Sequence, residues 1–250
     1  MSKPGAVPAP ENPTKVVRPS SPRRTYAPGH VLARASLWIR AFRLFVKLIF
    51  LLFFRVRVHG LENVPRGPVI VCANHLGWAD AFLILLFLPV EPRIYVLGDR
   101  NVLDISSFRT RVIMALRILV PLDRSKPVEA VRVMEGVLKR GGSLLIFPEG
   151  ALGTKEGELL ALEPGAAYLS VRSGVPLLPV GLTGTSELWL RRTLVVRIGK
   201  PIYPDAFTGD TASRVNAITD ALGRAMRALL PGDRERPRVR LLRRWLTNLF

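Results

Sequence analysis

The segment that decides the fold is residues 68–90, which read PVIVCANHLGWADAFLILLFLPV. Its first part, residues 68–73, is an apolar run that predicts a buried strand, and the second apolar run, from Ala81 to Val90, predicts a helix. His75 and Asp80 lie between the two runs. Because α/β proteins place their chemistry where the strands end, these two residues mark a candidate site.

The pair formed by His75 and Asp80 is typical of general-base chemistry. Asp80 can cap the helix that begins there, and it can also accept a hydrogen bond from one imidazole nitrogen. The other nitrogen is then free to take a proton. Alone, such a pair is more often a structural hydrogen bond than a catalytic one.

A second strand end carries a similar signal. Residues 143–150 read SLLIFPEG, so an apolar run ends in Pro148, Glu149 and Gly150. A glutamate at a strand end, followed by glycine, favours a cleft over a core. Two strand ends that both carry titratable groups predict one shared site.

Apolar runs typical of strands alternate with helical patterns from residue 56 to residue 205. This alternation predicts an α/β fold, with a single largely parallel sheet flanked by helices. We expect strands at 56–58, 69–73, 93–96, 143–147, 177–182 and 194–198, and helices at 36–54, 80–88, near 106–118, 127–139, 165–173 and 211–230.

Four sequence blocks resemble, in order, those of the glycerophospholipid acyltransferase family, of the lysophosphatidate acyltransferase type. Asn74 and His75 with Asp80 match the HX4D motif, and residues 120–125 (VPLDRS) match the second block. Residues 147–150 (FPEG) and 175–181 (VPLLPVG) match the third and fourth. The resemblance covers about residues 57–205.

The resemblance implies a role for each matching residue. His75 would be the general base and Asp80 would orient it, so that the hydroxyl of the substrate takes the place of the serine of a protease. Arg124 would bind the phosphate of the acceptor. Glu149 would orient the acceptor, within a substrate-binding block that includes Pro148 and Gly150.

The implied reaction moves a fatty acyl group from an acyl thioester, acyl-CoA or acyl-carrier protein, to the hydroxyl of a lysophospholipid. The default acceptor is 1-acylglycerol-3-phosphate, which gives phosphatidate. One departure keeps other acceptors open: the third block usually continues with Thr-Arg, where this chain has Ala151 and Leu152. A lyso-aminolipid or a glycolipid is the alternative acceptor, and a non-catalytic basic membrane-binding protein on the same fold is the alternative outside the enzymes.

We expect no metal and no cofactor. The sequence contains neither a Walker phosphate loop nor a dinucleotide-binding glycine pattern. One cysteine, Cys72, and three histidines cannot supply a zinc cluster of Cys and His. Cys72 lies inside the first strand and is expected to be a small core residue rather than a nucleophile.

The net charge of +18 is concentrated at the two ends of the chain. Residues 1–58 carry +10 and residues 232–250 carry +4, which leaves +4 for the 173 residues between them. A nucleic-acid-binding domain more often concentrates its charge on the folded body. Basic ends instead predict attachment to an anionic membrane surface and no nucleic-acid partner.

The chain divides into four parts. We expect a disordered basic tail at 1–30, an interfacial membrane helix at 31–55, the acyltransferase α/β domain at 56–232, and a basic amphipathic segment at 233–250. The last segment is either a second interfacial helix or an end that docks its apolar side on the domain. The expected location is the cytoplasmic face of a membrane, as a peripheral or monotopic protein.

In the helix expected at 36–54, Ser36, Arg40, Arg43 and Lys47 lie on one narrow arc. We expect these cations to face lipid headgroups and the opposite aromatic face to meet acyl chains. The uncharged run at 48–54 is too short to span a bilayer. The alternatives are a core helix packed on the sheet and a spanning helix with snorkelling cations.

Overall fold

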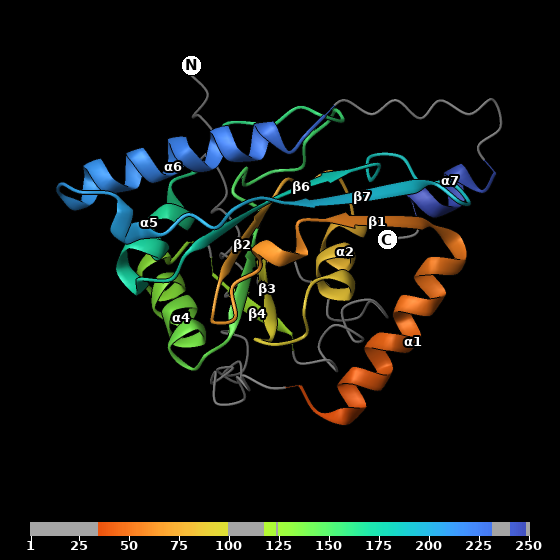
Figure 1. The fold of residues 1–250 in the computed structure, drawn as a ribbon, viewed down its shortest axis with the longest axis horizontal. Helices are drawn as coiled ribbons and strands as arrows, with labels where there is room; N and C mark the ends of the chain where they lie inside the picture. The colour runs from red at the N-terminus through yellow and green to blue at the C-terminus, as the bar shows by residue number, and fades with distance from the viewer. Residues whose placement is uncertain (1–34, 100–117, 124, 232–240, 249–250) are drawn as a thin grey trace, which may run out of the picture.

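The computed structural model describes residues 35–99, 118–123, 125–231 and 241–248. One seven-stranded sheet lies between two sets of helices, in the strand order β1-β7-β6-β2-β5-β3-β4 (Figure 1). The strands are β1 (Arg55–His59), β2 (Ile70–Ala73), β3 (Ile94–Asp99), β4 (Leu119–Leu122), β5 (Ser143–Ile146), β6 (Leu177–Thr183) and β7 (Thr193–Ile198). The helices are α1 (Leu37–Phe53), α2 (Ala79–Phe87), α4 (Pro127–Lys139), α5 (Gly165–Ser173), α6 (Thr211–Ala228) and α7 (Arg243–Thr247).

The predicted fold class is confirmed. Strands β2 to β6 are parallel to one another, β6 and β7 pair antiparallel, and β1 pairs parallel with β7. The carboxyl ends of β2, β5 and β6 therefore meet at one edge of the sheet, where the sequence blocks place their polar residues.

Strand β4 is an element that the sequence patterns did not predict. Its backbone pairs with β3 over residues 119–122, although Pro121 lacks an amide hydrogen. Because β4 lies at the edge of the sheet and pairs on one side only, the missing amide hydrogen affects no second strand. The other predicted strands and helices are confirmed to within a few residues, apart from the helix near 106–118, which lies almost wholly outside the described residues.

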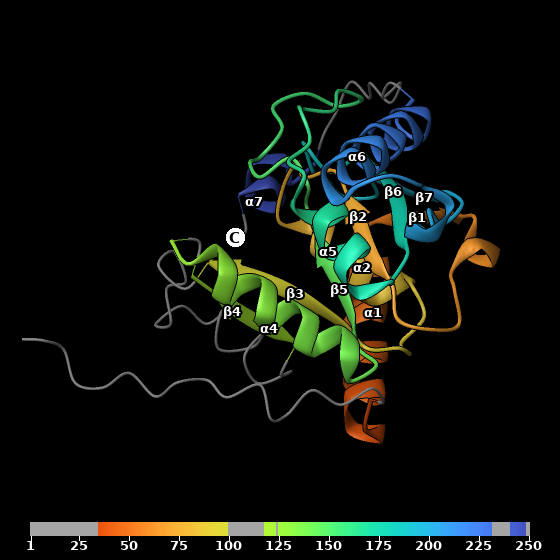
Figure 2. The same cartoon turned by 90° about the vertical axis from the view of Figure 1, so that its left-hand side faces the viewer.

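The core consists of two hydrophobic clusters, one on each face of the sheet. Val71 and Ala73 of β2 pack toward α1 and α2, whereas Ile70 and Cys72 pack toward α4, α5 and α6. Figure 2 looks onto α4 and α5, with α1 and α2 behind the sheet. Since both faces of β2 are covered, the strand reads as an unbroken apolar run. Burial raises the pKa of the Cys72 thiol, which fits the expected core role.

Helix α1 lies beside α2, and its cationic arc faces the domain. Arg43 donates from Nε to the Leu85 carbonyl at 2.7 Å and from Nη2 to the Leu86 carbonyl at 2.9 Å. Arg40 forms an ion pair with Glu91, and the Lys47 ammonium lies 4.7 Å from the centre of the Phe87 ring.

The prediction that these cations face lipid headgroups is therefore wrong. The physical reason lies at the end of α2, whose last carbonyls lack partners within the helix and carry the negative end of its dipole. A guanidinium group satisfies several of these carbonyls at once, and it gains more there than in water.

The opposite face of α1 is apolar and exposed, as expected. Trp38 is 75% exposed and Leu52 is 70% exposed, while Phe50 is buried against the sheet. The exposed side chains of this face are Leu37, Trp38, Leu44, Phe45, Leu48, Ile49 and Leu52. Within the described ranges, none of the helices has the length and apolar character needed to cross a membrane.

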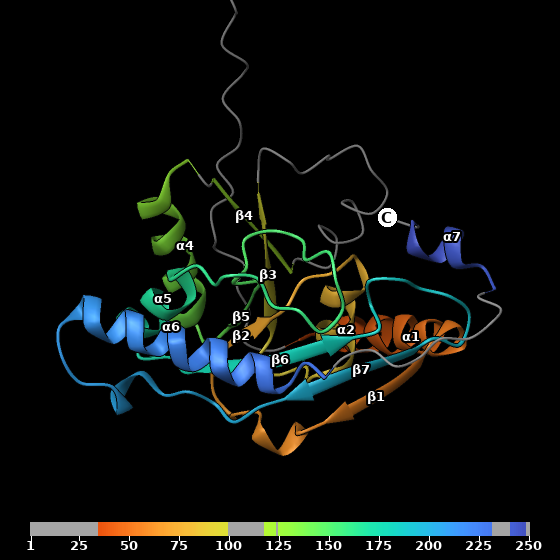
Figure 3. The same ribbon diagram turned by 90° about the horizontal axis from the view of Figure 1, so that it is seen from above.

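Helix α7 lies at the same end of the molecule as α1 in both Figure 1 and Figure 3. Its Leu246 is buried in the cluster that contains Phe50 of α1, whereas Leu241, Leu242 and Trp245 are exposed. The segment therefore docks one apolar side on the domain, as one of the two alternatives states, and leaves another apolar side exposed; an interfacial role stays a prediction.

Candidate active site

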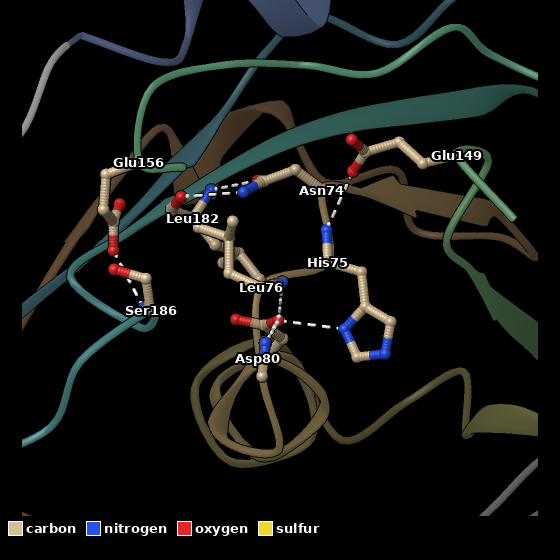
Figure 4. Close-up of polar contacts among 9 residues, drawn as sticks. Asn74, His75, Leu76, Asp80, Glu149, Glu156, Leu182 and Ser186 are labelled. Carbon is tan, nitrogen blue, oxygen red and sulfur yellow. Dashed lines mark hydrogen bonds and ion pairs between the residues drawn. The ribbon is translucent and has the colours of Figure 1, made fainter. Parts of the chain in front are cut away.

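The candidate site lies where β2 ends and α2 begins. His75 follows the last residue of β2 by two positions, and Asp80 is the second residue of α2 (Figure 4). Two roles were predicted for Asp80, and the first, capping of the helix, is wrong, because the N-cap residue of α2 is Trp78. Its fully buried carboxylate points back to the residues that precede the helix.

Oxygen Oδ2 of Asp80 binds three groups at once. His75 Nδ1 lies 2.9 Å from it, and the backbone N–H groups of Leu76 and Gly77 donate to it at 2.6 and 2.8 Å. The two backbone donors fix the carboxylate in place. With the carboxylate fixed, Nδ1 is the protonated nitrogen and Nε2 is the one left to act as a base.

The imidazole of His75 is fixed on one side and open on the other. Its ring stacks on Phe147, with 4.0 Å between ring centres and 13° between ring planes. The side chain is 28% exposed, and no described residue forms a hydrogen bond with Nε2. Figure 4 shows Nε2 pointing away from Asp80. Phe147 is a contributor that the sequence motif did not single out.

Asn74 joins the end of β2 to β6. Its side-chain amide donates to the Leu182 carbonyl at 3.0 Å and accepts from the Leu182 N–H at 2.7 Å, as a paired strand would. The residue is buried, so both bonds are made away from water. A buried asparagine at a strand end is the signal that could have indicated this role.

Glu149 binds the backbone on both sides of the site. Its Oε1 accepts from the His75 N–H at 2.9 Å, and its Oε2 accepts from the Leu160 N–H at 2.8 Å. The Gly153 N–H also donates to the His75 carbonyl at 2.7 Å. The structure thus brings the two strand-end signals together, with Glu149 as a positioning residue; contact with the acceptor stays a prediction.

Pro148 and Gly150 have backbone roles beside Glu149. Pro148 is buried, and its carbonyl accepts from the Glu163 N–H at 2.7 Å. Gly150 has a φ of +68°, a left-handed conformation that favours glycine. Their predicted contact with substrate stays a prediction, and Arg124 lies outside the described residues.

Three further observations complete the description of the site. The Gly77 N–H is taken by Asp80, so it is not available to stabilise an oxyanion. Glu156, which the sequence did not indicate, accepts from the N–H groups of Gly184 and Ser186 at 3.0 and 2.9 Å (Figure 4). In the part of the chain that the structure describes, no three His, Cys, Asp or Glu residues are grouped to hold a metal ion.

The sheet topology and the histidine–aspartate pair define an α/β enzyme fold with its site at a strand end. A family model described as Acyltransferase matches residues 55–183, and the chain belongs to this family.

The curated relatives are named 1-acyl-sn-glycerol-3-phosphate acyltransferases. The chain is 31% identical to the protein of Saccharomyces cerevisiae over 69% of this chain and 60% of the relative. It is 29% identical to the protein of Bacillus subtilis over 74% of this chain and 92% of the relative. The chain spans 60%, 50% and 55% of the lengths of the yeast protein and the proteins of Cocos nucifera and Limnanthes douglasii.

A solved structure supports the same placement. The crystal structure of the 1-acyl-sn-glycerophosphate acyltransferase of Thermotoga maritima matches with a TM-score of 0.61 and 25% identity. The match covers 76% of this chain and 79% of that one.

Proposed function

We propose that the chain transfers a fatty acyl group from an acyl thioester to the hydroxyl of a lysophospholipid, with 1-acylglycerol-3-phosphate as the acceptor and phosphatidate as the product. The observation that carries this proposal is the bond of 2.9 Å between His75 Nδ1 and the fully buried Asp80 carboxylate, with Nε2 open. The names of the curated relatives support the choice of acceptor.

The geometry supports a direct transfer. Nε2 of His75 takes the proton of the acceptor hydroxyl while its oxygen attacks the thioester carbonyl, and Asp80 stabilises the imidazolium that forms. Collapse of the tetrahedral intermediate breaks the C–S bond, and the departing thiolate receives the proton from His75. No covalent enzyme intermediate is needed, and Cys72, the one cysteine, is too deeply buried to form one.

The substrates require no cofactor or metal in this scheme, because the thioester is already activated. Acyl-CoA and acyl-carrier protein are both suitable donors. We assign the phosphate of the acceptor to Arg124, which follows β4 in the sequence. The carboxyl end of β4 lies at the same edge of the sheet as that of β2, because the two strands belong to the parallel set. The buried Glu149 fixes the backbone of His75 by accepting a hydrogen bond from its N–H.

A second acceptor class is favoured by one observation. Where the family usually has Thr-Arg, this chain has Ala151 and Leu152, and the Leu152 side chain is exposed. An exposed leucine cannot bind a phosphate, so a lyso-aminolipid or a glycolipid is the second candidate acceptor.

The lipid substrate and the exposed face of α1 fit a location on a membrane surface. An apolar helix face and a net charge of +10 on residues 1–58 together favour an anionic bilayer. We place the protein on the cytoplasmic face as a peripheral or monotopic enzyme.

The test is an acyl-transfer assay with the full chain. Labelled acyl-CoA or acyl-carrier protein is incubated with lysophosphatidate, a lyso-aminolipid and a glycolipid, and the products are separated by mass. Phosphatidate is the expected product, and acylation confined to another acceptor would select the second candidate. A folded protein that acylates none of the acceptors from either donor would overturn the proposal in favour of a non-catalytic membrane-binding protein.

A further inference from the structure

Residues 241–248 return to the sheet face that carries α1 and α2. The Leu190 N–H donates to the Leu241 carbonyl at 2.9 Å. Thr247 Oγ1 accepts from the Leu188 N–H at 3.0 Å and donates to the Leu188 carbonyl at 3.1 Å. Leu246, between these two hydrogen-bonded residues in the sequence, is buried. The segment therefore has a fixed position beside the connection between β6 and β7.

The outer side of this segment is apolar and continues the exposed face of α1. Leu241, Leu242 and Trp245 are exposed, the last by 53%. The Trp245 ring centre lies 6.1 Å from that of Phe53, in the last turn of α1. In Figures 1 and 3 the two helices lie at the same end of the molecule. Together they form one exposed apolar surface, here called the α1–α7 surface.

The charges around the α1–α7 surface indicate what covers it. Arg243 and Arg244 precede Trp245 and are exposed, and Arg243 also pairs with Glu187. Arg191 is exposed and donates to the Leu51 carbonyl of α1 at 3.3 Å. Residues 232–250 carry a net charge of +4. Tryptophan and leucine flanked by arginine match the interfacial zone of a bilayer, where rings meet acyl chains and guanidinium groups meet anionic headgroups. This complementarity selects an anionic lipid surface as the partner.

The same segment is bonded to the residue beside the catalytic pair. Trp78 Nε1 donates to the Leu246 carbonyl at 3.0 Å, and Trp78 is the N-cap of α2, two residues before Asp80. The Trp78 ring also meets the edge of the Phe50 ring of α1, with 6.4 Å between ring centres. A surface that docks through α1 and α7 therefore lies next to the turn that holds His75.

We propose that α7 is a second membrane-contacting element, which docks with α1 on an anionic bilayer and brings the His75 turn to the lipid surface. The docking stands on the α1–α7 surface itself, and its use for catalysis rests on the proposed lysolipid acyltransferase function.

The first experiment places a reporter on α7 in the full chain. Cys72 is fully buried, so a thiol-reactive, environment-sensitive dye will label a cysteine introduced by Leu242→Cys. The matched control is Val128→Cys. Val128 is 66% exposed and lies at the start of α4, a different element from α7. Vesicles of phosphatidylglycerol and phosphatidylcholine should shift the dye emission to the blue at position 242 and leave position 128 unchanged. A Leu48→Cys reporter on α1 that shifts while position 242 does not would overturn the proposal.

The second experiment measures affinity. The triple variant Leu241→Ser, Leu242→Ser and Trp245→Ser is compared with a control that changes three exposed apolar residues elsewhere, Leu61→Ser, Val128→Ser and Tyr203→Ser. Because three apolar side chains leave the bilayer, vesicle affinity of the first variant should fall by about tenfold or more relative to the control. Equal affinity of the two variants would overturn the proposal.

The two proposals fail in different ways. If the reporter at position 242 shifts on vesicles but the protein acylates no acceptor, docking is supported and the acyltransferase function is overturned. If the protein acylates a short-chain, soluble lysolipid but the reporter stays in water, the enzyme stands and the role of α7 is overturned.

Discussion

The imidazole of His75 is held from three directions. Asp80 binds Nδ1, Phe147 covers one face of the ring, and Glu149 binds the backbone N–H of the same residue. Asp80 fixes the tautomer of the imidazole, Phe147 limits the tilt of its ring, and Glu149 fixes the position of the strand end. Such preorganisation is what a general base needs, because the proton must be taken from a hydroxyl in one geometry.

His75→Ala should abolish acyl transfer without unfolding the protein. Loss of the general base is expected to lower kcat by about 10²- to 10⁴-fold. Asp80→Asn should also be severely impaired, because a neutral amide does not stabilise the imidazolium. The measurement is kcat with a short-chain, soluble lysolipid, and His59→Ala, at the exposed end of β1, is the matched control. Turnover near the original level in folded His75→Ala protein would contradict the assigned base.

Glu149→Gln should act through stability and through kcat. Glu149 accepts from two backbone N–H groups, whereas glutamine has one acceptor oxygen, so one buried N–H loses its partner at a cost of about 1–3 kcal/mol. We expect a lower Tm, with kcat reduced more than the KM for the acceptor is raised. The exposed Glu158→Gln serves as the control. An unchanged Tm with a raised acceptor KM would instead show that Glu149 contacts the acceptor.

At the level of elements, α1 contacts the domain through its polar arc, whereas most of its apolar face is exposed. Ser36 caps the helix, and the arc that continues through Arg40, Arg43 and Lys47 contacts α2 and the turn after it. Burial lowers the pKa of Arg43, which shows how far its guanidinium has left water. The apolar face that would ordinarily be buried is consequently left free for a partner.

Arg43→Gln should loosen α1 from α2. The glutamine cannot replace the guanidinium group at the carbonyls of Leu85, Leu86 and Leu88. Bonds from a charged donor are worth about 1.5–3 kcal/mol each, so the midpoint of urea unfolding should fall. Limited proteolysis near α1 should become faster in the same variant. Arg224→Gln, at an exposed position of α6, is the control. If the two variants unfold at the same urea concentration, the contact between Arg43 and α2 contributes nothing to the attachment.

At the level of the whole molecule, the positive charge and the exposed apolar surface lie in the same parts of the chain. The ends of the chain carry +14 of the net +18, and the α1–α7 surface is built from the elements next to those ends. The central domain is close to neutral, so the positive field of the protein comes mainly from the parts that we expect to touch an anionic bilayer.

Vesicle binding should weaken with added salt but persist. Each basic residue near an anionic surface contributes about 1 kcal/mol, which salt screens, whereas burial of the apolar surface is not screened. Arg18→Gln with Arg23→Gln and Arg24→Gln should lower the preference for anionic vesicles, measured by co-sedimentation at low and high salt. Arg40→Gln, whose parent residue pairs with Glu91, is the control and should keep that preference. Complete release at high salt would show that the apolar face does not enter the bilayer.

Most elements and the contact between His75 and Asp80 were predicted correctly because they depend on short-range patterns. The apolar run at residues 68–73 predicts a strand covered on both faces, and His75 and Asp80 follow it at the junction with the next apolar run. The α/β fold, the site at the strand end and the amphipathic nature of α1 all follow from such local periodicity and from residue type.

Other features depend on groups that are distant in sequence and meet only on packing. Trp78 and Leu246 are bonded across 168 positions, Arg43 meets the end of α2, and β4 joins the sheet as an edge strand beside β3. The same arc of cations would fit a lipid headgroup or the carbonyls of a helix end, and the periodicity of α1 is identical in both cases. Packing selects between them because α2 presents unpaired carbonyls at that place, and a buried polar group must find a partner.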